Sequence, residues 1–122
     1  MKLGIVGSRR RNSQEDKAII KGRILALRPT LIISGGCPQG ADKFAEELAK
    51  ELSIPIKIYY PEKVQPGSPR WAYTKVNYAR NKLIALSSHQ LIALVAPDRK
   101  GGTENTIGYF KKFRDEKSLE IL

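Results

Sequence analysis

The chain has 122 residues, with 22 Lys and Arg against 12 Asp and Glu, so its formal net charge is +10. With 41% hydrophobic and 28% charged residues, the composition excludes a disordered chain and predicts one globular domain over residues 1–122. One cysteine and one histidine exclude a disulfide framework and a four-ligand structural zinc site. The longest apolar run, residues 91–97, falls short of the ~20 residues that span a bilayer. We therefore expect a cytoplasmic protein that contacts no membrane and holds no metal or resident cofactor.

Short apolar runs alternate with amphipathic stretches through the first half of the chain. Strands are predicted at residues 3–6, 31–33 and 54–60. The first helix begins after Ser13, which forms a capping box with Asp16, and it ends at Pro29. The inward faces of the first two helices are predicted to carry Ile20, Ile24 and Leu27, and then Ala45, Leu48, Ala49 and Leu52.

The second half of the chain continues this alternation after a proline-rich loop over residues 61–70. A third helix follows, a fourth strand is predicted at residues 91–96, and an edge strand at residues 119–122 closes the chain. The predicted inward faces of the third and fourth helices are Val76, Ala79, Leu83 and Leu86, and then Ile107, Phe110 and Phe113. Strands separated by helices predict an α/β, three-layer, Rossmann-like sandwich, with a parallel sheet of about five strands and helices on both faces. With strand order 3-2-1-4-5, ligands bind beyond the carboxyl ends of strands one and four.

Glycines and polar residues follow three of these strands, where the ligand is expected. They are Gly7, Ser8 and Arg9 after the first strand, Ser34, Gly35, Gly36, Gly40 and Asp42 after the second, and Gly101, Gly102 and Thr103 after the fourth. Glycines at a strand-to-helix turn expose backbone amides and the positive end of the helix dipole to an anion. Their spacing matches neither the dinucleotide fingerprint nor the P-loop, so the segments predict a phosphate site of another kind. The alternative is that the glycines only permit tight turns and that Asp42 stabilises a helix start.

Positive charge is predicted to gather at the same edge of the sheet. Six cations map there or to the adjoining helix starts: Arg9, Arg10, Arg11, Arg80, Arg99 and Lys100. Such a cluster focuses anions toward one crevice. Other cations, such as Arg114, lie elsewhere and leave a polyanionic partner open.

The aromatic residues beside the long loop allow two interpretations. Tyr60 and Trp71, with Tyr59, either pack beneath the loop or stack on a base. Cys37 and His89 are not expected to form a nucleophile and base, because Cys37 follows the second strand whereas His89 precedes the fourth.

Three segments together resemble a known superfamily. They are Gly7-Ser8-Arg9, the run from Ser34-Gly35-Gly36 to Gly40-Ala41-Asp42, and residues 80–87, which begin with Arg80-Asn81. In this order, and over nearly the whole chain, they resemble the Rossmann-like core of the DNA-processing protein DprA (Smf). DprA forms the SLOG superfamily with the LOG phosphoribohydrolases and the small stand-alone YspA-like proteins, which the chain resembles most. The resemblance implies a nucleotide or nucleic-acid phosphate site with Arg80 and Asn81 beside it.

The chain also departs from these relatives. Full DprA proteins carry additional segments around this core, to which nothing here corresponds. The LOG enzymes, which cleave the base from a nucleoside 5′-monophosphate, show Gly-Gly-x-Gly-Thr-x-x-Glu after the fourth strand. Here Thr103 is followed by Glu104, and Thr106 stands at the family's glutamate position. Arg80 matches the family's catalytic arginine, so the resemblance makes Arg80 and Glu104 the catalytic candidates; the alternative is that Glu104 only favours the start of its helix.

These observations support several functions. The leading hypothesis is a module that binds or senses a nucleotide or a nucleotide derivative. The enzymatic alternative is hydrolysis of an N-glycosidic bond in nucleoside 5′-monophosphates, with Glu104 or Asp42 stabilising the sugar cation. A second alternative is single-stranded nucleic-acid binding, and a third is a scaffold without a ligand. We also expect a homo-oligomer, a dimer formed through the exposed face of the third or fourth helix.

Overall fold

Five parallel strands form one sheet in the computed structural model, which describes residues 1–122. The strands are β1 (Lys2–Gly7), β2 (Leu31–Ser34), β3 (Ile56–Ile58), β4 (Gln90–Leu94) and β5 (Leu119–Ile121). Their order across the sheet is β3-β2-β1-β4-β5, and every pairing is parallel. The predicted Rossmann-like α/β fold and its strand order are therefore confirmed.

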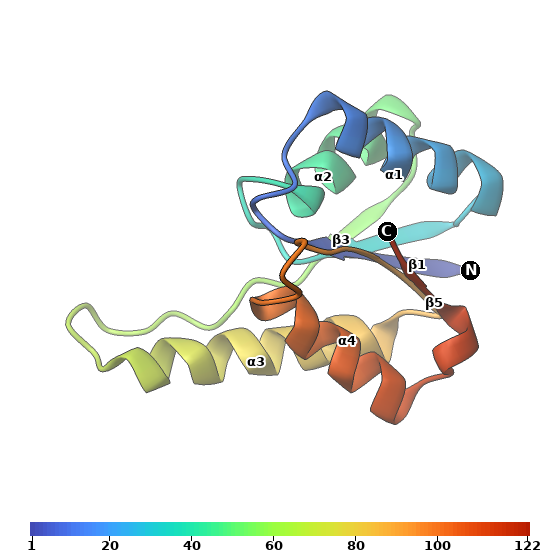
Figure 1. Ribbon diagram of the computed structural model, residues 1–122. Helices are drawn as coiled ribbons and strands as arrows, with labels where there is room; N and C mark the ends of the chain where they lie inside the picture. The colour runs from blue at the N-terminus through green and yellow to red at the C-terminus, as the bar shows by residue number, and fades with distance from the viewer.

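Four α-helices cover the two faces of this sheet. They are α1 (Gln14–Leu27), α2 (Ala41–Glu51), α3 (Arg70–Ser87) and α4 (Gly102–Phe113), and a short 3₁₀ helix, Glu116–Ser118, precedes β5. Figure 1 shows α1 and α2 on one face and α3 and α4 on the other. The first turns of α3 and the loop before it extend past the sheet (Figure 1).

Alternate residues of each strand enter two separate cores, as the period of two in a strand requires. Leu3 and Ile5 of β1 pack with Ile20, Phe44 and Leu48 under α1 and α2. On the other face the core contains Val6, Ile33, Ile84, Leu91, Ile107 and Phe110. The three central strands, β2, β1 and β4, are buried on both faces, which explains their nearly continuous apolar runs.

The predicted start of α1 is confirmed in detail. The Ser13 hydroxyl accepts a hydrogen bond from the Asp16 N–H at 3.1 Å, and the Asp16 carboxylate accepts one from the Ser13 N–H at 3.3 Å. Arg11 adds an ion pair to Asp16 at 2.9 Å. Burial alone would raise the pKa of the Asp16 carboxyl, but the hydrogen bonds from Arg11 and Ser13 outweigh it and lower that pKa.

The third strand is shorter than predicted. Residues 54–60 were the expected range, whereas regular pairing covers only Ile56–Ile58. Pro55 has no N–H to donate to the sheet, and β3 is an edge strand whose one neighbour, β2, has only four residues. The chain leaves the sheet at Tyr59 and enters the long loop.

The prediction for α3 is wrong about which face is buried. The residues that face the sheet and α4 are Asn81, Ile84 and Ala85, with Ser88 just beyond the helix. Leu83 and Leu86, expected inside, are 48% and 42% exposed. The end of α3 passes directly against β1, because a Cβ on Gly4 would collide with the Ser88 side chain. No helix of the chain is both long and apolar enough to cross a membrane.

Candidate functional site

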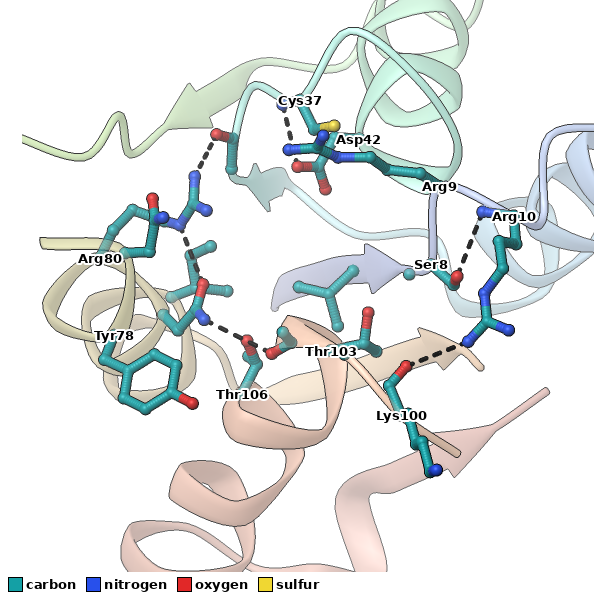
Figure 2. A pocket seen from close by; sticks show the side chains of 18 of the residues that line it. Ser8, Arg9, Arg10, Cys37, Asp42, Tyr78, Arg80, Lys100, Thr103 and Thr106 are labelled. Atoms are coloured by element: carbon teal, nitrogen blue, oxygen red, sulfur yellow. Dashed lines mark hydrogen bonds between the residues drawn. The ribbon is translucent and has the colours of Figure 1, made fainter. Parts of the chain in front are cut away.

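A polar cleft of about 730 Å³ opens at the carboxyl end of the sheet, between the loops that follow β1, β2 and β4. It lies where the strand order reverses, the position at which open α/β sheets bind ligands. Figure 2 shows Ser8, Arg10 and Lys100 on one side, Cys37 and Asp42 on a second, and Arg80 and Tyr78 on a third. The lining residues are Val6, Gly7, Ser8, Arg9, Arg10, Gly35, Cys37, Asp42, Thr74, Asn77, Tyr78, Arg80, Asn81, Ile84, Lys100, Gly101, Gly102, Thr103 and Thr106.

Three consecutive arginines after β1 have three different environments. The Arg10 guanidinium forms a bidentate ion pair with Asp98, at 2.6 and 3.0 Å. The backbone N–H of Arg10 donates to the Ser8 hydroxyl at 3.1 Å. Arg11 points away from the cleft and donates to the carbonyl oxygens of Val95 and Leu122. Arg9 lines the cleft and is exposed, with no carboxylate within ion-pair distance. Of the three, Arg9 is the guanidinium left free for a ligand.

Gly7 is required by the packing of the protein itself. A Cβ at this position would lie 2.6 Å from the Ala41 Cβ and 2.9 Å from the Leu94 carbonyl oxygen. The strand therefore passes directly against the first residue of α2. Gly7 still lines the cleft, but its neighbours explain its identity without a ligand.

The segment after β2 holds a buried carboxylate in the cleft wall. Asp42 is 8% exposed, and one of its oxygens accepts the Cys37 N–H at 3.0 Å. The Ser34 hydroxyl lies 3.0 Å from the other oxygen and 3.0 Å from the Ile5 carbonyl oxygen, so it can donate to either. Burial raises the pKa of the Asp42 carboxyl above its ordinary value, although these donors and the charge of Arg80 oppose the rise.

Two of the predicted glycines in this segment shape the wall but do not line the cleft. Gly40 begins α2 with φ of +73°, and a Cβ there would lie 2.7 Å from the Ser8 carbonyl oxygen. Its N–H donates to the Asn12 side chain at 2.9 Å. Gly36 packs beneath the ring of Tyr60, and Ser34 is buried behind Asp42.

Arg80 joins α3 to the segment after β2. Its guanidinium donates to the Gly35 carbonyl oxygen at 2.5 Å and to the Asn81 side chain at 2.9 Å. A Cβ on Gly35 would lie 2.9 Å from the Arg80 Nη1 and 3.0 Å from the Asp42 Oδ2, so the glycine lets both groups approach the backbone closely. Burial lowers the pKa of Arg80, and the charge of Asp42 partly restores it. A guanidinium nevertheless stays protonated in a protein, so the wall carries a fixed cation beside a buried carboxylate.

The start of α4 faces the cleft without a side-chain cap. Gly101 is its N-cap residue, and Gly102 and Thr103 of the first turn line the cleft. Asn81 holds this turn by donating to the Asn105 side chain at 3.1 Å. The uncapped turn presents backbone N–H groups and a positive dipole end to the cleft.

Glu104, a predicted catalytic candidate, lies outside the cleft lining. Arg99 holds its carboxylate through two hydrogen bonds of 2.9 Å. Arg99, one of the cations predicted at this edge, is therefore paired with Glu104 and does not line the cleft. Among the acidic residues proposed from the sequence, Asp42 is the one whose side chain borders the cleft.

The aromatic residue of the cleft is one that the sequence interpretation missed. Tyr60 and Trp71 are exposed and line no part of it, whereas Tyr78 borders it together with Thr74 and Asn77. These three residues precede Asn81 by seven, four and three positions, so they share its helix face. That helical spacing from the Arg80-Asn81 pair is the signal that would have found them.

Cys37 and His89 lie at opposite ends of the sheet. Cys37 borders the cleft at the carboxyl end. His89 accepts the Lys2 N–H on its Nδ1 at 2.9 Å, at the beginning of β1. No group of three or more His, Cys, Asp or Glu side chains is placed to hold a metal ion.

The fold and the site thus define a Rossmann-like α/β protein with a polar, cationic cleft at the switch point of its sheet. No protein-family model matches the chain, and no curated protein matches it. Among solved structures, a molybdenum cofactor carrier protein from Chlamydomonas reinhardtii is similar at 13% identity and a TM-score of 0.47. The match covers 98% of this chain and 87% of that one. So distant a structural similarity does not identify a ligand for this chain.

Proposed function

We propose that the chain binds a nucleotide or nucleotide derivative in this cleft. The observation that carries the proposal is the presence in one cleft of an uncapped helix start, at Gly101 to Thr103, and the free guanidinium of Arg9. Backbone N–H groups at a helix start and a guanidinium fork are the donors that phosphate oxygens accept best. A volume of about 730 Å³ also lies within the range of small-molecule sites.

The arrangement of the lining supports one orientation of the ligand. The phosphate would lie between Ser8, Arg9 and the first turn of α4, where donors and positive charge are concentrated. The base would lie toward Asn77 and Tyr78 on α3, because an aromatic face stacks on any base and an amide can pair with a base edge. Arg80, between these two ends, would neutralise charge near the sugar.

The resemblance to the DprA and LOG superfamily supports the same site. The segments that carry it contribute Gly7, Ser8, Arg9, Gly35, Asp42, Arg80 and Asn81 to the cleft lining. Gly101, Gly102 and Thr103 stand where the LOG enzymes have their glycine-rich segment.

Calorimetric titration of the full chain tests the proposal. The ligands are the four nucleoside 5′-monophosphates, ribose 5-phosphate and inorganic phosphate. At least one nucleotide should bind more tightly than phosphate, and Arg9→Ala should weaken its affinity by roughly tenfold or more, the worth of a charged hydrogen bond. Arg114→Ala removes the same charge from an exposed position outside the cleft and serves as the matched control. Equal losses in both variants, or no binding of any nucleotide, would refute the proposal.

Salt dependence separates this function from single-stranded nucleic-acid binding. An oligonucleotide that contacts several phosphates loses affinity with a log-log slope of about 0.7 per phosphate, whereas a mononucleotide in a cleft has a shallow dependence. A steep slope with oligothymidine, together with no binding of mononucleotides, would favour the nucleic-acid alternative.

The buried carboxylate of Asp42 supports a second candidate, hydrolysis of the N-glycosidic bond. Water would add across the C1′–N bond, its hydroxyl going to C1′ and a proton to the departing base. Asp42 would stabilise the positive charge on the sugar while Arg9 and the first turn of α4 hold the phosphate. Chromatography of nucleoside monophosphates after incubation would detect free base. Loss of release in Asp42→Asn but not in Glu104→Gln would support this reaction, and no release with the unaltered chain would exclude it for these substrates.

A further inference from the structure

The third helix carries a second apolar face, on the side away from the sheet. Five apolar residues follow one another there at spacings of four, three, four and three: Ala72, Val76, Ala79, Leu83 and Leu86. This is the spacing of a coiled-coil seam, in which apolar positions of one helix meet those of a partner helix. Leu83 and Leu86 lie three residues apart and are about half exposed. Contiguous exposed apolar surface marks interaction sites.

A hollow beside this seam is suited to an apolar side chain. Its volume is about 150 Å³, and it is lined by Val76, Ala79 and Leu83 of the helix, by Tyr60 and Pro61 of the loop, and by three charged residues, Glu62, Lys75 and Arg80. A cavity of about this size accepts a benzene molecule. One large apolar side chain of a partner helix would therefore fill it.

The charges around the seam indicate what kind of helix fits. Helix α3 has no acidic residue, and Lys75 and Lys82 flank the seam on one side. No ion pair of the chain involves a residue of α3. The Lys82 amine instead lies 5.2 Å from the centre of the Phe113 ring. A second copy of this chain would bring these lysines against one another, which costs energy, whereas acidic side chains would neutralise them.

We propose that this face of α3 binds an amphipathic helix of another protein, with leucine-like residues in the seam and Asp or Glu opposite Lys75 and Lys82. The mode is that of a helix bound in an apolar groove, in which the anchor residues of the helix recur every three or four residues. The seam lies on the side of α3 opposite Asn81 and Ile84, which face the cleft. Arg80 borders both the cleft and the hollow, whereas Leu83 and Leu86 of the seam do not line the cleft.

Two synthetic peptides of about three heptads test this proposal with the full chain. Both have leucine at the seam positions, and their flanking positions are glutamate in one and lysine in the other. Fluorescence anisotropy should show the acidic peptide binding roughly tenfold or more tightly than the basic one. In the double variant Lys75→Glu with Lys82→Glu, the preference should reverse.

Matched variants locate the binding surface. Leu83→Asp should abolish binding of the acidic peptide, whereas Leu25→Asp, at a leucine of α1 that is 54% exposed, should leave it unchanged. Thermal unfolding by circular dichroism checks that both variants fold. The proposal is overturned if both peptides bind equally or neither binds, or if oligothymidine displaces the acidic peptide. A dimer by light scattering that dissociates in Leu83→Asp would also overturn it, because the occupant would then be a second copy of the chain.

Discussion

Replacing Gly7 with alanine adds one methyl group where β1 passes against α2. The added Cβ would lie 2.6 Å from the Ala41 Cβ, and 2.9 Å from both the Cβ and the carbonyl oxygen of Leu94. None of these atoms belongs to the flexible end of a side chain, so none can rotate away. The strand itself has to move.

The size of the effect follows from these distances. Carbon atoms in contact lie about 3.5–4.0 Å apart, so the clash requires a shift of about 1 Å between β1 and α2. Overpacking of this kind costs about 1–3 kcal/mol in the free energy of unfolding. For a chain of this size we expect the melting temperature to fall by roughly 3–15 °C. Ser8 to Arg10 continue directly from the displaced strand, so nucleotide affinity should fall as well.

Thermal and urea unfolding, with calorimetry for the ligand, measure both effects. Gly22→Ala is the matched control: it lies inside α1, its added Cβ meets nothing within 4 Å, and it should stabilise the chain by about 0.5–1 kcal/mol. A second change, Ala41→Gly, removes the shortest of the contacts and should recover part of the loss in a double-mutant cycle. Unchanged stability in Gly7→Ala would refute the packing argument. If stability falls but nucleotide affinity is unchanged, the end of β1 does not contribute to the proposed nucleotide site.

Four further predictions use other features of the structure. Asp42→Asn should gain stability relative to the unaltered chain as the pH rises above 3.8, because burial raises the pKa of this carboxyl and its ionisation then opposes folding. Asp16→Asn should instead lose relative stability as the pH rises toward 3.8: burial alone would raise that pKa, but hydrogen bonds from a guanidinium and the helix cap lower it. Urea unfolding across this pH range measures both variants against the unaltered chain. If the two differences in unfolding free energy changed with pH in the same direction, the opposite pKa shifts of Asp42 and Asp16 would be contradicted. Ser13→Ala should cost about 0.5–2 kcal/mol through loss of the cap of α1, also measured by urea unfolding. Tyr78→Ala should weaken nucleotide affinity by about 5- to 150-fold in calorimetry, because one stacked base is worth about 1–3 kcal/mol. Tyr73 lies on the same helix and is 41% exposed, against 43% for Tyr78, so Tyr73→Ala is the control and should leave the affinity unchanged. Equal losses of affinity in both variants would exclude the stacking role.

The sequence by itself determined the elements, their order in the sheet and the edge at which polar loops gather. Apolar periodicity is a local property, and the handedness of strand–helix–strand crossovers leaves few topologies for such an alternation. The Ser13 cap was equally predictable, because its partner Asp16 lies only three residues away. Most of the predicted loop residues therefore line the cleft, as do Arg80 and Asn81.

Only the tertiary structure decided which of several equivalent side chains faces the cleft. Arg9, Arg10 and Arg11 are identical in type and adjacent in sequence, but Arg10 meets Asp98 and Arg11 meets Asp16, which leaves Arg9 free. Asp98 lies 88 residues from Arg10, so that ion pair leaves no signal in a local pattern, and the choice among the three arginines depends on it.

The same reason explains α3. This helix is apolar on two faces, so its periodicity did not distinguish the face that packs on the sheet from the one that carries Leu83 and Leu86. In the structure Ile84, Ala85 and Ser88 face the sheet, and Ser88 lies so close to Gly4 that a Cβ there would collide with it. Steric fit between segments 84 residues apart is a property of the folded chain, and it turned a predicted core face into an exposed one.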